Sequence, residues 1–210
     1  MQGRIPGPVP PGLTIFETMR VEADGRVLLW PRHLARLRQG CAAVGFPLDE
    51  GQVTDALARL PQGRVLRARL AVDSSGSITL THADLPPNPP LWRVAISSYR
   101  LRPDDPWLSI KSSHRPVYDA ARAEMVDDTD EMLLLNDQGF PCEGSISNLF
   151  VLRDGVLLTP PRDHGLLPGV LRADLLAQGR ARETPLQIAD LRNGFFCGNA
   201  LRGLIPARLR

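Results

Sequence analysis

Lys111 is the residue whose amino-acid type most narrowly limits the chemistry that this sequence could perform. It is the only lysine, and the other 24 of the 25 basic residues are arginines. A guanidinium stays protonated in proteins, whereas a lysine amine can lose its proton and attack a carbonyl. The apolar residues Trp107, Leu108 and Ile110 precede Lys111 and would partly desolvate its amine, which favours the neutral form. The alternative is that Lys111 is a surface lysine without a function, in a chain whose coding bias favours arginine over lysine.

Two further charged residues have neighbours that suit a binding site. Glu143 lies in the run PCEGSISNLF, where it leads into a predicted strand and precedes Gly144, which permits close approach of the backbone to a ligand. Arg36 lies on a predicted helix in the run RHLARL. Each also has a simpler interpretation, as a solvated turn carboxylate for Glu143 and as an exposed helix arginine for Arg36.

Two turns that contain glycine are candidates for holding a phosphate. HGLLPGVLR places Gly169, Val170 and Leu171 at a predicted helix N-terminus, where free amides and the helix dipole favour an anion. CGNALRG places Asn199 and Ala200 in a similar turn. Most such turns bind nothing, but these two occur with one lysine, one acid and one arginine. This set suits an aldehyde cofactor with a pyridine nitrogen and a phosphate, namely pyridoxal 5′-phosphate.

A resemblance to a known family rests on six motifs in order: FETMRV, RHLARL, IKSSHR, EGSISNLFVLRDGVLLTPP, LLPGVLRADLL and GNALRGLIP. They span residues 13 to 207 and resemble class IV (fold-type IV) pyridoxal-phosphate enzymes. These enzymes are the branched-chain aminotransferases, the D-amino-acid aminotransferases and the aminodeoxychorismate lyases. The resemblance implies a two-lobed α/β (α+β) architecture of the D-amino-acid aminotransferase type.

The resemblance also implies roles for individual residues. Lys111 is similar to the Schiff-base lysine, Glu143 to the partner of the pyridine nitrogen, and Arg36 to the arginine that binds the phosphate. The remaining phosphate contacts would come from the amides of Val170 and Leu171 and from the turn at Asn199 and Ala200. His114 and Arg115, just past the lysine, are candidates for substrate contacts, although a polar helix start in solvent explains them equally well.

The sequence around Lys111 resembles the lyase branch most. The aminotransferase pattern has a tyrosine five residues after the lysine, whereas this sequence has Pro116. KSSHRPVY and NALRGLIPA are closer to aminodeoxychorismate lyases, especially to lyase domains fused behind aminodeoxychorismate synthase. The family usually has segments that flank the six motifs and help to shape the substrate pocket, and we expect this chain to lack them.

We therefore expect a lyase that acts on 4-amino-4-deoxychorismate, releases pyruvate and leaves 4-aminobenzoate in the folate pathway. The alternatives are a class IV aminotransferase acting on branched-chain or D-amino acids, and an inactive homologue with a binding role. The resemblance further implies a homodimer, and cooperation with aminodeoxychorismate synthase is a further expectation.

The elements that must position these residues follow from hydrophobic spacing and turn residues. The expected strands cover residues 13–21, 27–30, 65–72, 77–81, 93–98, 131–135, 147–152, 156–158 and 195–197. The expected helices cover residues 32–44, 55–60 and 117–125 and a segment that begins after Gly169 and ends at Gly179. Because strands and helices do not alternate regularly, we expect largely antiparallel sheets.

The proline-rich run LPPNPP marks the expected domain boundary, because proline cannot continue a helix or an inner strand. We expect a smaller N-terminal lobe at residues 1–86, a linker at 87–92, and a larger C-terminal lobe at 93–210 with Lys111 and the phosphate-binding turns.

Composition limits the class of protein and the kinds of binding partner that remain possible for this chain. Hydrophobic residues make up 43% of the chain and charged residues 23%, which is ordinary for a globular protein. The net charge of +2 without a basic cluster gives no indication of nucleic-acid or membrane binding. Cys41, Cys142 and Cys197 fit no metal-ligand spacing, so we expect no metal site and reduced thiols in the cytoplasm.

Overall fold

The computed structural model describes residues 4–210 and divides into two compact units, so the first three residues of the expected N-terminal lobe lie outside the described range. The first unit is the chain up to Pro87 together with Ile110–His114, and the second is Asn88–Ser109 with Arg115–Arg210. Each unit has its own sheet. The segment that contains Lys111 thus groups with the first unit, whereas the sequence predicts it for the C-terminal lobe.

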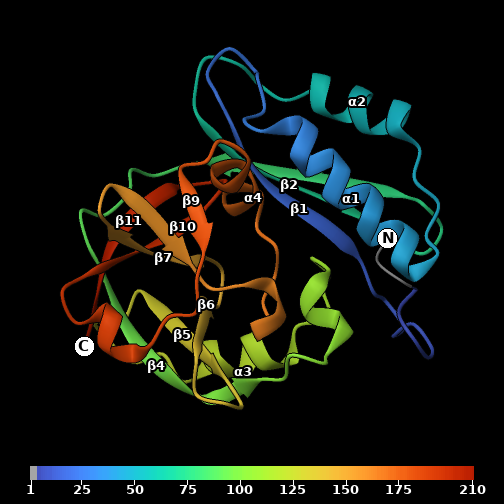
Figure 1. Cartoon of the computed structure of the whole chain (residues 1–210). Coiled ribbons are helices and arrows are strands. Elements are labelled where there is room, and N and C mark those ends of the chain that lie inside the picture. Colours follow the sequence, from blue (N-terminus) through green and yellow to red (C-terminus); the bar gives the residue numbers. More distant parts are fainter. Residues whose placement is uncertain (1–3) are drawn as a thin grey trace. The chain divides into compact units, whose positions relative to one another are not determined.

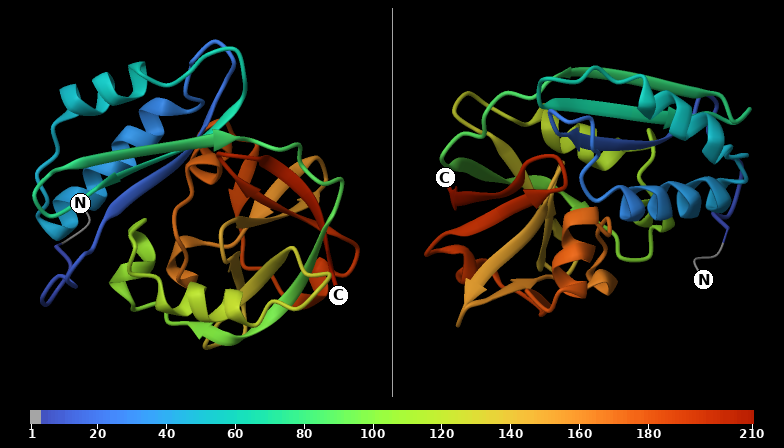
Figure 2. Two further views of the ribbon diagram at one scale, coloured as in Figure 1. Left: turned by 180° about the vertical axis from the view of Figure 1, so that it is seen from behind. Right: turned by 90° about the horizontal axis from the view of Figure 1, so that it is seen from above.

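The first unit consists of a three-stranded antiparallel sheet and two helices (Figure 1). In chain order its elements are β1 (Ile15–Val21), α1 (Trp30–Val44), α2 (Glu50–Ala58), β2 (Leu66–Val72) and β3 (Ile78–Asp84). The strand order is β1-β2-β3. Helix α1 packs on β1 and α2 on β3, and Figure 2 shows both helices on one face of the sheet.

Gly40 allows α1 to lie close to the sheet. A Cβ atom added to Gly40 would lie 2.7 Å from Cγ2 of Ile15 on β1, so glycine allows the helix to approach the strand. Gly45 ends the helix in the left-handed conformation, with φ of +76°, which L-residues with a side chain rarely adopt. This close packing holds the residues of α1 against those of β1.

The second unit is built around a larger sheet with two helices. In chain order its elements are β4 (Trp92–Leu101), α3 (Pro116–Ala123), β5 (Glu131–Asn136), β6 (Pro141–Gly144), β7 (Asn148–Arg153), β8 (Val156–Thr159), α4 (Val170–Ala177), β9 (Ala181–Glu183), β10 (Phe195–Asn199) and β11 (Gly203–Leu209). Three short 3-10 helices lie at Pro106–Ser109, Arg162–His164 and Ile188–Leu191. Helix α3 packs on β4 and β5, and α4 packs on β9 and β10.

Six strands of the second unit close into a ring. The sheet order is β10-β11-β4-β5-β6-β7-β8-β9, and β7 pairs in addition with β10, which joins the two ends of the six-stranded part. The pairings of β4 with β5 and with β11 are parallel, as is that of β8 with β9, while the others are antiparallel. The prediction of mixed elements with largely antiparallel sheets is therefore confirmed.

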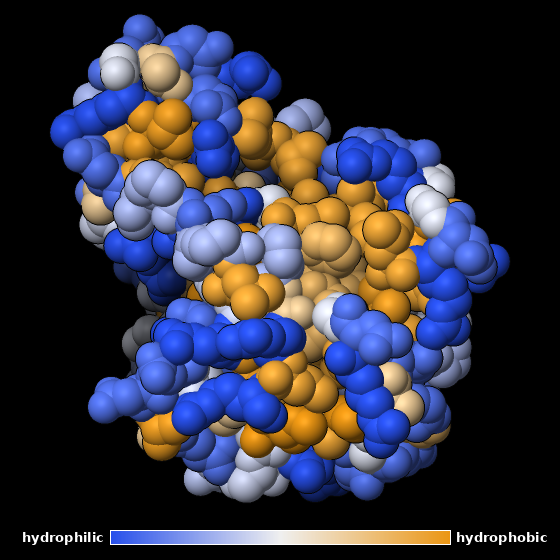
Figure 3. Space-filling view, turned by 90° about the vertical axis from the view of Figure 1, so that its left-hand side faces the viewer, coloured by the Kyte–Doolittle hydropathy of each residue, from blue (hydrophilic) through white to orange (hydrophobic). Residues whose placement is uncertain are grey.

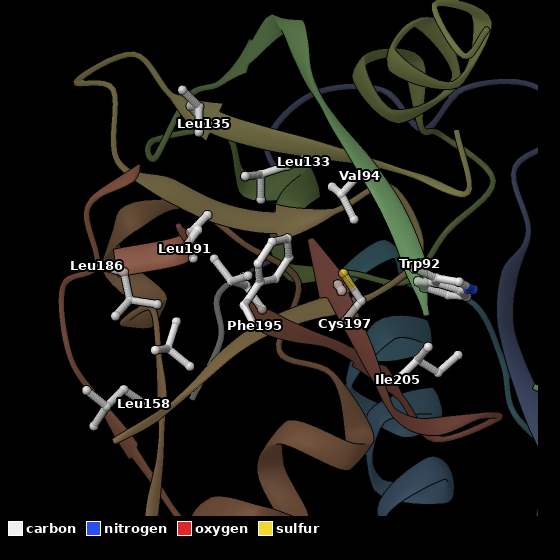
Figure 4. Packing of buried hydrophobic residues seen from close by; sticks show 13 residues of the cluster. Trp92, Val94, Leu133, Leu135, Leu158, Leu186, Leu191, Phe195, Cys197 and Ile205 are labelled. Carbon is white, nitrogen blue, oxygen red and sulfur yellow. The ribbon is translucent and has the colours of Figure 1, made fainter. Parts of the chain in front are cut away.

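Buried apolar side chains of the second unit form one large cluster. Figure 4 shows side chains from β4, β5 and β10, among them Val94, Leu133 and Phe195, converging on a common space. The cluster consists of Trp92, Val94, Leu133, Leu135, Leu149, Val151, Leu158, Leu186, Leu191, Phe195, Cys197, Ile205 and Ala207. Burial of this apolar area is the main force that stabilises the strand ring.

The surface of the molecule carries polar and apolar residues in patches, as Figure 3 shows for one face. Large exposed apolar side chains of the second unit include Ile96 and Tyr99 on β4. Among residues 4–210, no helix is long and apolar enough to cross a membrane. In the same range, no group of three or more histidine, cysteine or acidic side chains is arranged to hold a metal ion.

One predicted strand is wrong. Val27 makes only an isolated bridge to Val21, and Trp30 already begins α1. Leu29 has a left-handed backbone with φ of 55°, which interrupts an extended chain, and Pro31 favours a helix start at this point. Strands β6, β9 and β11 were not predicted, because two of them are very short and β11 contains a proline.

Candidate active site

Lys111 lies in an extended segment that pairs with the start of β1. The backbone N–H of Phe16 donates to the carbonyl oxygen of Lys111 at 3.0 Å, and Ser113 N–H donates to Thr14 O at 2.8 Å. The Lys111 amine lies 4.8 Å from the centre of the Phe16 ring. Cζ of Arg69 lies 3.5 Å from the centre of the same ring. The Phe16 ring therefore contacts two cations, and the fold of the first unit holds the lysine beside its sheet.

Arg36 is held by a buried acid on β1. Its Nε donates to Oε1 of Glu17 at 2.7 Å, and Nδ1 of His33 lies 2.7 Å from Oε2 of the same carboxylate. Helix α1 presents His33 and Arg36 on one face because residues three apart in a helix are neighbours. Burial raises the pKa of Glu17, but Arg36 and His33 more than offset this and lower it to about 2.

We predict that acid destabilises the protein through Glu17. The folded-state pKa lies below the ordinary value of 4.5, so the stabilisation is present above pH 4.5 and is lost as the pH falls through about 2. The lost free energy of unfolding should amount to about 3 kcal/mol. Unfolding by urea at several pH values measures it, and Glu17→Gln should show a correspondingly flatter pH dependence.

An exposed ion pair between α1 and the first residue of α2 serves as the matched control. Arg38 forms a bidentate ion pair with the Glu50 carboxylate, and about half of each side chain is exposed to solvent. Glu50→Gln should therefore leave the pH dependence of unfolding nearly unchanged. Equal pH dependence in the wild-type protein and in Glu17→Gln would show that the Glu17 pair contributes nothing.

Glu143 lies on β6 and is only 3% exposed. Its Oε1 accepts hydrogen bonds from the Tyr118 hydroxyl at 2.6 Å and from the Leu167 N–H at 2.9 Å. Its Oε2 accepts one from Nδ2 of Asn148 at 3.3 Å, and the same nitrogen donates to Leu167 O at 2.9 Å. A buried carboxylate with three such donors is held in one orientation.

Neighbouring strands connect Glu143 to the predicted phosphate turns. Glu143 of β6 pairs with Asn148 of β7, and Asn148 pairs with Gly198 of β10. A Cβ atom added to Gly198 would lie 3.1 Å from Cδ2 of Leu171 near the start of α4. One added to Gly169, the residue before α4, would lie 1.9 Å from Oδ1 of Asn148. The second unit therefore brings the acid, the start of α4 and the end of β10 together.

The Asn199 side chain shapes the turn between β10 and β11. Its Oδ1 accepts hydrogen bonds from the backbone N–H groups of Leu201 and Arg202 at 3.1 and 2.9 Å. Its Nδ2 donates to Ile146 O at 3.2 Å. Ala200 is the next residue of this turn. The structure thus gives Asn199 a role in holding the backbone of the turn.

The two candidates for substrate contacts differ in their surroundings. The backbone of His114 closes a small turn with Oγ of Ser112, at 3.3 Å from the His114 nitrogen. Nη2 of Arg115 donates to Ser145 O at 2.7 Å, and its Cζ lies 4.9 Å from the centre of the Tyr118 ring. Arg115 is thus held by contacts within the second unit.

The predicted site residues fall into two sets. Arg36, Lys111 and His114 belong to the first unit. The second unit contains Arg115, Glu143, Val170, Leu171, Asn199 and Ala200. Within each unit the structure adds polar residues that sequence reasoning missed, namely Glu17, His33, Tyr118 and Asn148. The available signal was a charged Glu17 within an otherwise apolar strand face, which indicates a buried ion pair.

Comparison with known proteins identifies relatives that match most of the chain. Residues 14–209 match the family model described as amino-transferase class IV. A protein of Schizosaccharomyces pombe named "Putative aminodeoxychorismate lyase" is 28% identical over 86% of this chain and 81% of its own length. A Methanocaldococcus jannaschii protein named "Putative branched-chain-amino-acid aminotransferase" is 37% identical over 84% of this chain and 70% of its own.

Solved structures show the same fold. A "Putative amino-acid aminotransferase" from Mesorhizobium loti is 40% identical, with a TM-score of 0.87, and covers 94% of this chain and 100% of its own. The 4-amino-4-deoxychorismate lyase from Pseudomonas aeruginosa is 26% identical, with a TM-score of 0.75, over 93% of this chain and 82% of its own. A hypothetical aminotransferase from Mycobacterium tuberculosis in a pyridoxal-phosphate-bound form has a TM-score of 0.78 at 22% identity, over 93% and 81%.

Proposed function

We propose that this chain, which belongs to the class IV aminotransferase family, is a lyase that converts 4-amino-4-deoxychorismate into 4-aminobenzoate and pyruvate. The observation that carries the proposal is the position five residues after the lysine. It is occupied by Pro116, the first residue of α3, where the aminotransferase pattern has a tyrosine. The chain has only two tyrosines: Tyr118 binds Glu143 and Tyr99 is exposed on β4. The names of the S. pombe and P. aeruginosa relatives support the same activity.

The cofactor is pyridoxal 5′-phosphate, as the family and its pyridoxal-phosphate-bound relative indicate. The residues of this chain fit it. Gly169 leaves the start of α4 without a side chain, because a Cβ there would collide with Asn148. A helix start of this kind offers backbone N–H groups to a phosphate. The buried Glu143 carboxylate, held by three donors, suits a protonated pyridine nitrogen.

Each residue then has a role in binding. When bound, the cofactor supplies an aldehyde and an electron-withdrawing pyridine ring. We propose that Lys111 binds the aldehyde of the cofactor and that Glu143 binds its pyridine nitrogen. We assign the phosphate to Arg36, to the N–H groups of Val170 and Leu171, and to the turn at Asn199 and Ala200. Glu17 holds the Arg36 guanidinium in place for this task.

We predict that Gly169→Ala weakens cofactor binding. The added methyl group must displace Asn148, which disturbs both Glu143 and the start of α4. Strain of this kind typically costs about 1–3 kcal/mol, so the dissociation constant of pyridoxal 5′-phosphate should rise about tenfold or more. Titration of the apo protein with cofactor, followed by visible absorbance, measures it. An unchanged dissociation constant would remove the start of α4 from the cofactor site.

The lyase reaction needs only proton transfers from the protein. The Lys111 amine takes the proton from the substrate carbon that bears the amino group. It returns a proton as the bond between the ring and the enolpyruvyl oxygen breaks, so that the side chain leaves as pyruvate and the ring becomes aromatic. Substrate and products balance without a second substrate, whereas transamination needs an amino acid and an oxo acid in turn.

Two assays test the activity. Purified holoenzyme is supplied with aminodeoxychorismate in one, and with branched-chain or D-amino acids plus 2-oxoglutarate in the other. We expect pyruvate and 4-aminobenzoate in equal amounts in the first assay and negligible formation of glutamate in the second. Steady transamination without pyruvate release would establish the second candidate, an aminotransferase, which the names of the M. loti and M. jannaschii relatives favour.

We further propose that the protein is a two-fold homodimer in the cytoplasm that draws its substrate from an aminodeoxychorismate synthase. Homodimers of this symmetry are the commonest assemblies. All three cysteines are buried and form no disulfide bond, which suits a reducing compartment. Light scattering at micromolar concentration should give twice the mass of the chain, and the mass of one chain would refute the dimer.

A further inference from the structure

Tyr118 is a buried residue on α3 whose hydroxyl reaches the candidate site. It donates a hydrogen bond of 2.6 Å to Oε1 of Glu143. The ring lies beside the Arg115 guanidinium, whose Cζ is 4.9 Å from the ring centre. The side chain also belongs to the apolar cluster of Leu101, Leu108, Ala121, Met132, Leu134, Cys142 and Leu166. Packing on these neighbours leaves the hydroxyl directed at the carboxylate.

Helix α3 is joined to the chain just after Glu143 by two arginines. Nη2 of Arg115 donates to Ser145 O at 2.7 Å, and Nη1 of Arg122 donates to Ser145 Oγ at 3.0 Å. Ser145 in turn donates from its N–H to Oε1 of the buried Glu131 at 3.0 Å. The position of Tyr118 relative to Glu143 is therefore defined from both ends of the helix.

We propose that Tyr118 is a positioning residue that keeps Glu143 ionised and oriented, and thereby keeps a proton on the nitrogen that Glu143 binds. The inference rests on the proposed role of Glu143 toward the pyridine nitrogen. A hydrogen bond donated to a carboxylate stabilises its charged form. Without that bond Glu143 becomes a stronger base and draws the shared proton away from the nitrogen, which weakens the ring as an electron acceptor.

Tyr118 stays protonated at any pH at which the enzyme would work. Burial raises the pKa of Tyr118 well above its ordinary value, and the charge of Glu143 and the hydrogen bond to it raise it further. Arg115 opposes this shift and Asp105 adds to it. The hydroxyl therefore acts as a permanent donor to Glu143, with Arg115 and Asp105 as the other charged groups that affect it.

The first test uses the cofactor-free protein. In a Tyr99→Phe background Tyr118 is the only tyrosine, so biosynthetic incorporation of fluorotyrosine labels this position alone and makes the phenol more acidic. Its fluorine resonance is followed against pH with and without Glu143→Gln, and circular dichroism monitors folding. We expect the titration midpoint to fall by about one to two pH units when the carboxylate is replaced. Equal midpoints would overturn the proposal.

The second test uses holoenzyme with cofactor labelled with nitrogen-15 at the pyridine nitrogen. In Tyr118→Phe we expect this resonance to move toward its unprotonated position and kcat to fall about tenfold, with KM little changed. Tyr99→Phe removes an exposed phenol hydroxyl and should change neither the nitrogen-15 resonance nor kcat. A wild-type resonance in Tyr118→Phe would overturn the proposal even if turnover fell, because a merely structural role lowers activity without moving the proton.

The two tests separate this inference from the proposed function. The fluorine titration needs neither cofactor nor substrate, so it stands if the enzyme proves to be an aminotransferase. An unprotonated nitrogen already in the wild-type holoenzyme would refute the role of Glu143, and with it the proposed role of Tyr118. If that nitrogen is protonated and Tyr118→Phe leaves it so, only the role of Tyr118 fails.

Discussion

Lys111→Ala is expected to lower turnover by at least about 10³-fold, because the same amine binds the cofactor and moves the proton. Borohydride should also fail to attach pyridoxal 5′-phosphate to a side chain of the variant. The sequence makes this test unusually clean, since Lys111 is the only lysine and its loss removes the last side-chain amine. Mass spectrometry of reduced and digested protein locates any adduct.

Lys111→Arg is the matched control for charge. It keeps a cation next to the Phe16 ring but cannot supply a neutral amine, so turnover should fall as far as in Lys111→Ala. Recovery of activity in Lys111→Arg would mean that only the positive charge matters. A borohydride adduct at a side chain of Lys111→Ala would show that another group binds the aldehyde.

Glu143→Gln is expected to lower turnover by roughly 10²-fold or more while the cofactor stays bound. The amide keeps the size of the side chain but carries no charge to stabilise a protonated pyridine nitrogen. Cofactor affinity, turnover and the free energy of unfolding should be measured on the same preparation. The structure predicts a large change in turnover, because the three donors that surround Glu143 orient a carboxylate.

Glu131→Gln provides a comparison at a second buried acid. Glu131 accepts hydrogen bonds from Ser145, Ile146 and Ser147, so it supports the chain that follows Glu143. Its replacement should lower the stability of the fold more than the turnover of the folded fraction. Unchanged turnover in Glu143→Gln would refute the assignment of the pyridine nitrogen, and loss of cofactor binding would make Glu143 a structural residue.

Regular patterns predicted most elements of the fold. The spacing of Leu37, Cys41 and Val44 predicts α1, and these residues are buried in it. The alternation along β2 likewise predicts a strand with one buried face. The pattern failed at Val27–Trp30, because four residues with apolar character cannot distinguish a strand from the entry to a helix, and Leu29 turns the chain there.

Local sequence patterns could not predict that the strands of the second unit close into a ring. It depends on the pairing of β7 with β10, whose residues lie about fifty positions apart, and on parallel pairings of β4 with β5 and β11. Such pairings are selected by burial of a shared apolar cluster, a property of the whole chain. The segment around Lys111 likewise pairs with β1, which is far from it in sequence.

The sequence by itself determined which groups can do chemistry here. A solitary lysine, one acid in EGSISNLF, one arginine in RHLARL and two glycine turns define a set of functional groups, because residue type limits charge and nucleophilicity wherever the residue lies. Only the tertiary structure decided how those groups are supported. Glu17 and His33 hold Arg36, and Tyr118 and Asn148 hold Glu143. A buried charge must find its hydrogen-bond partners in space, and sequence distance does not show which polar residues the fold brings to it.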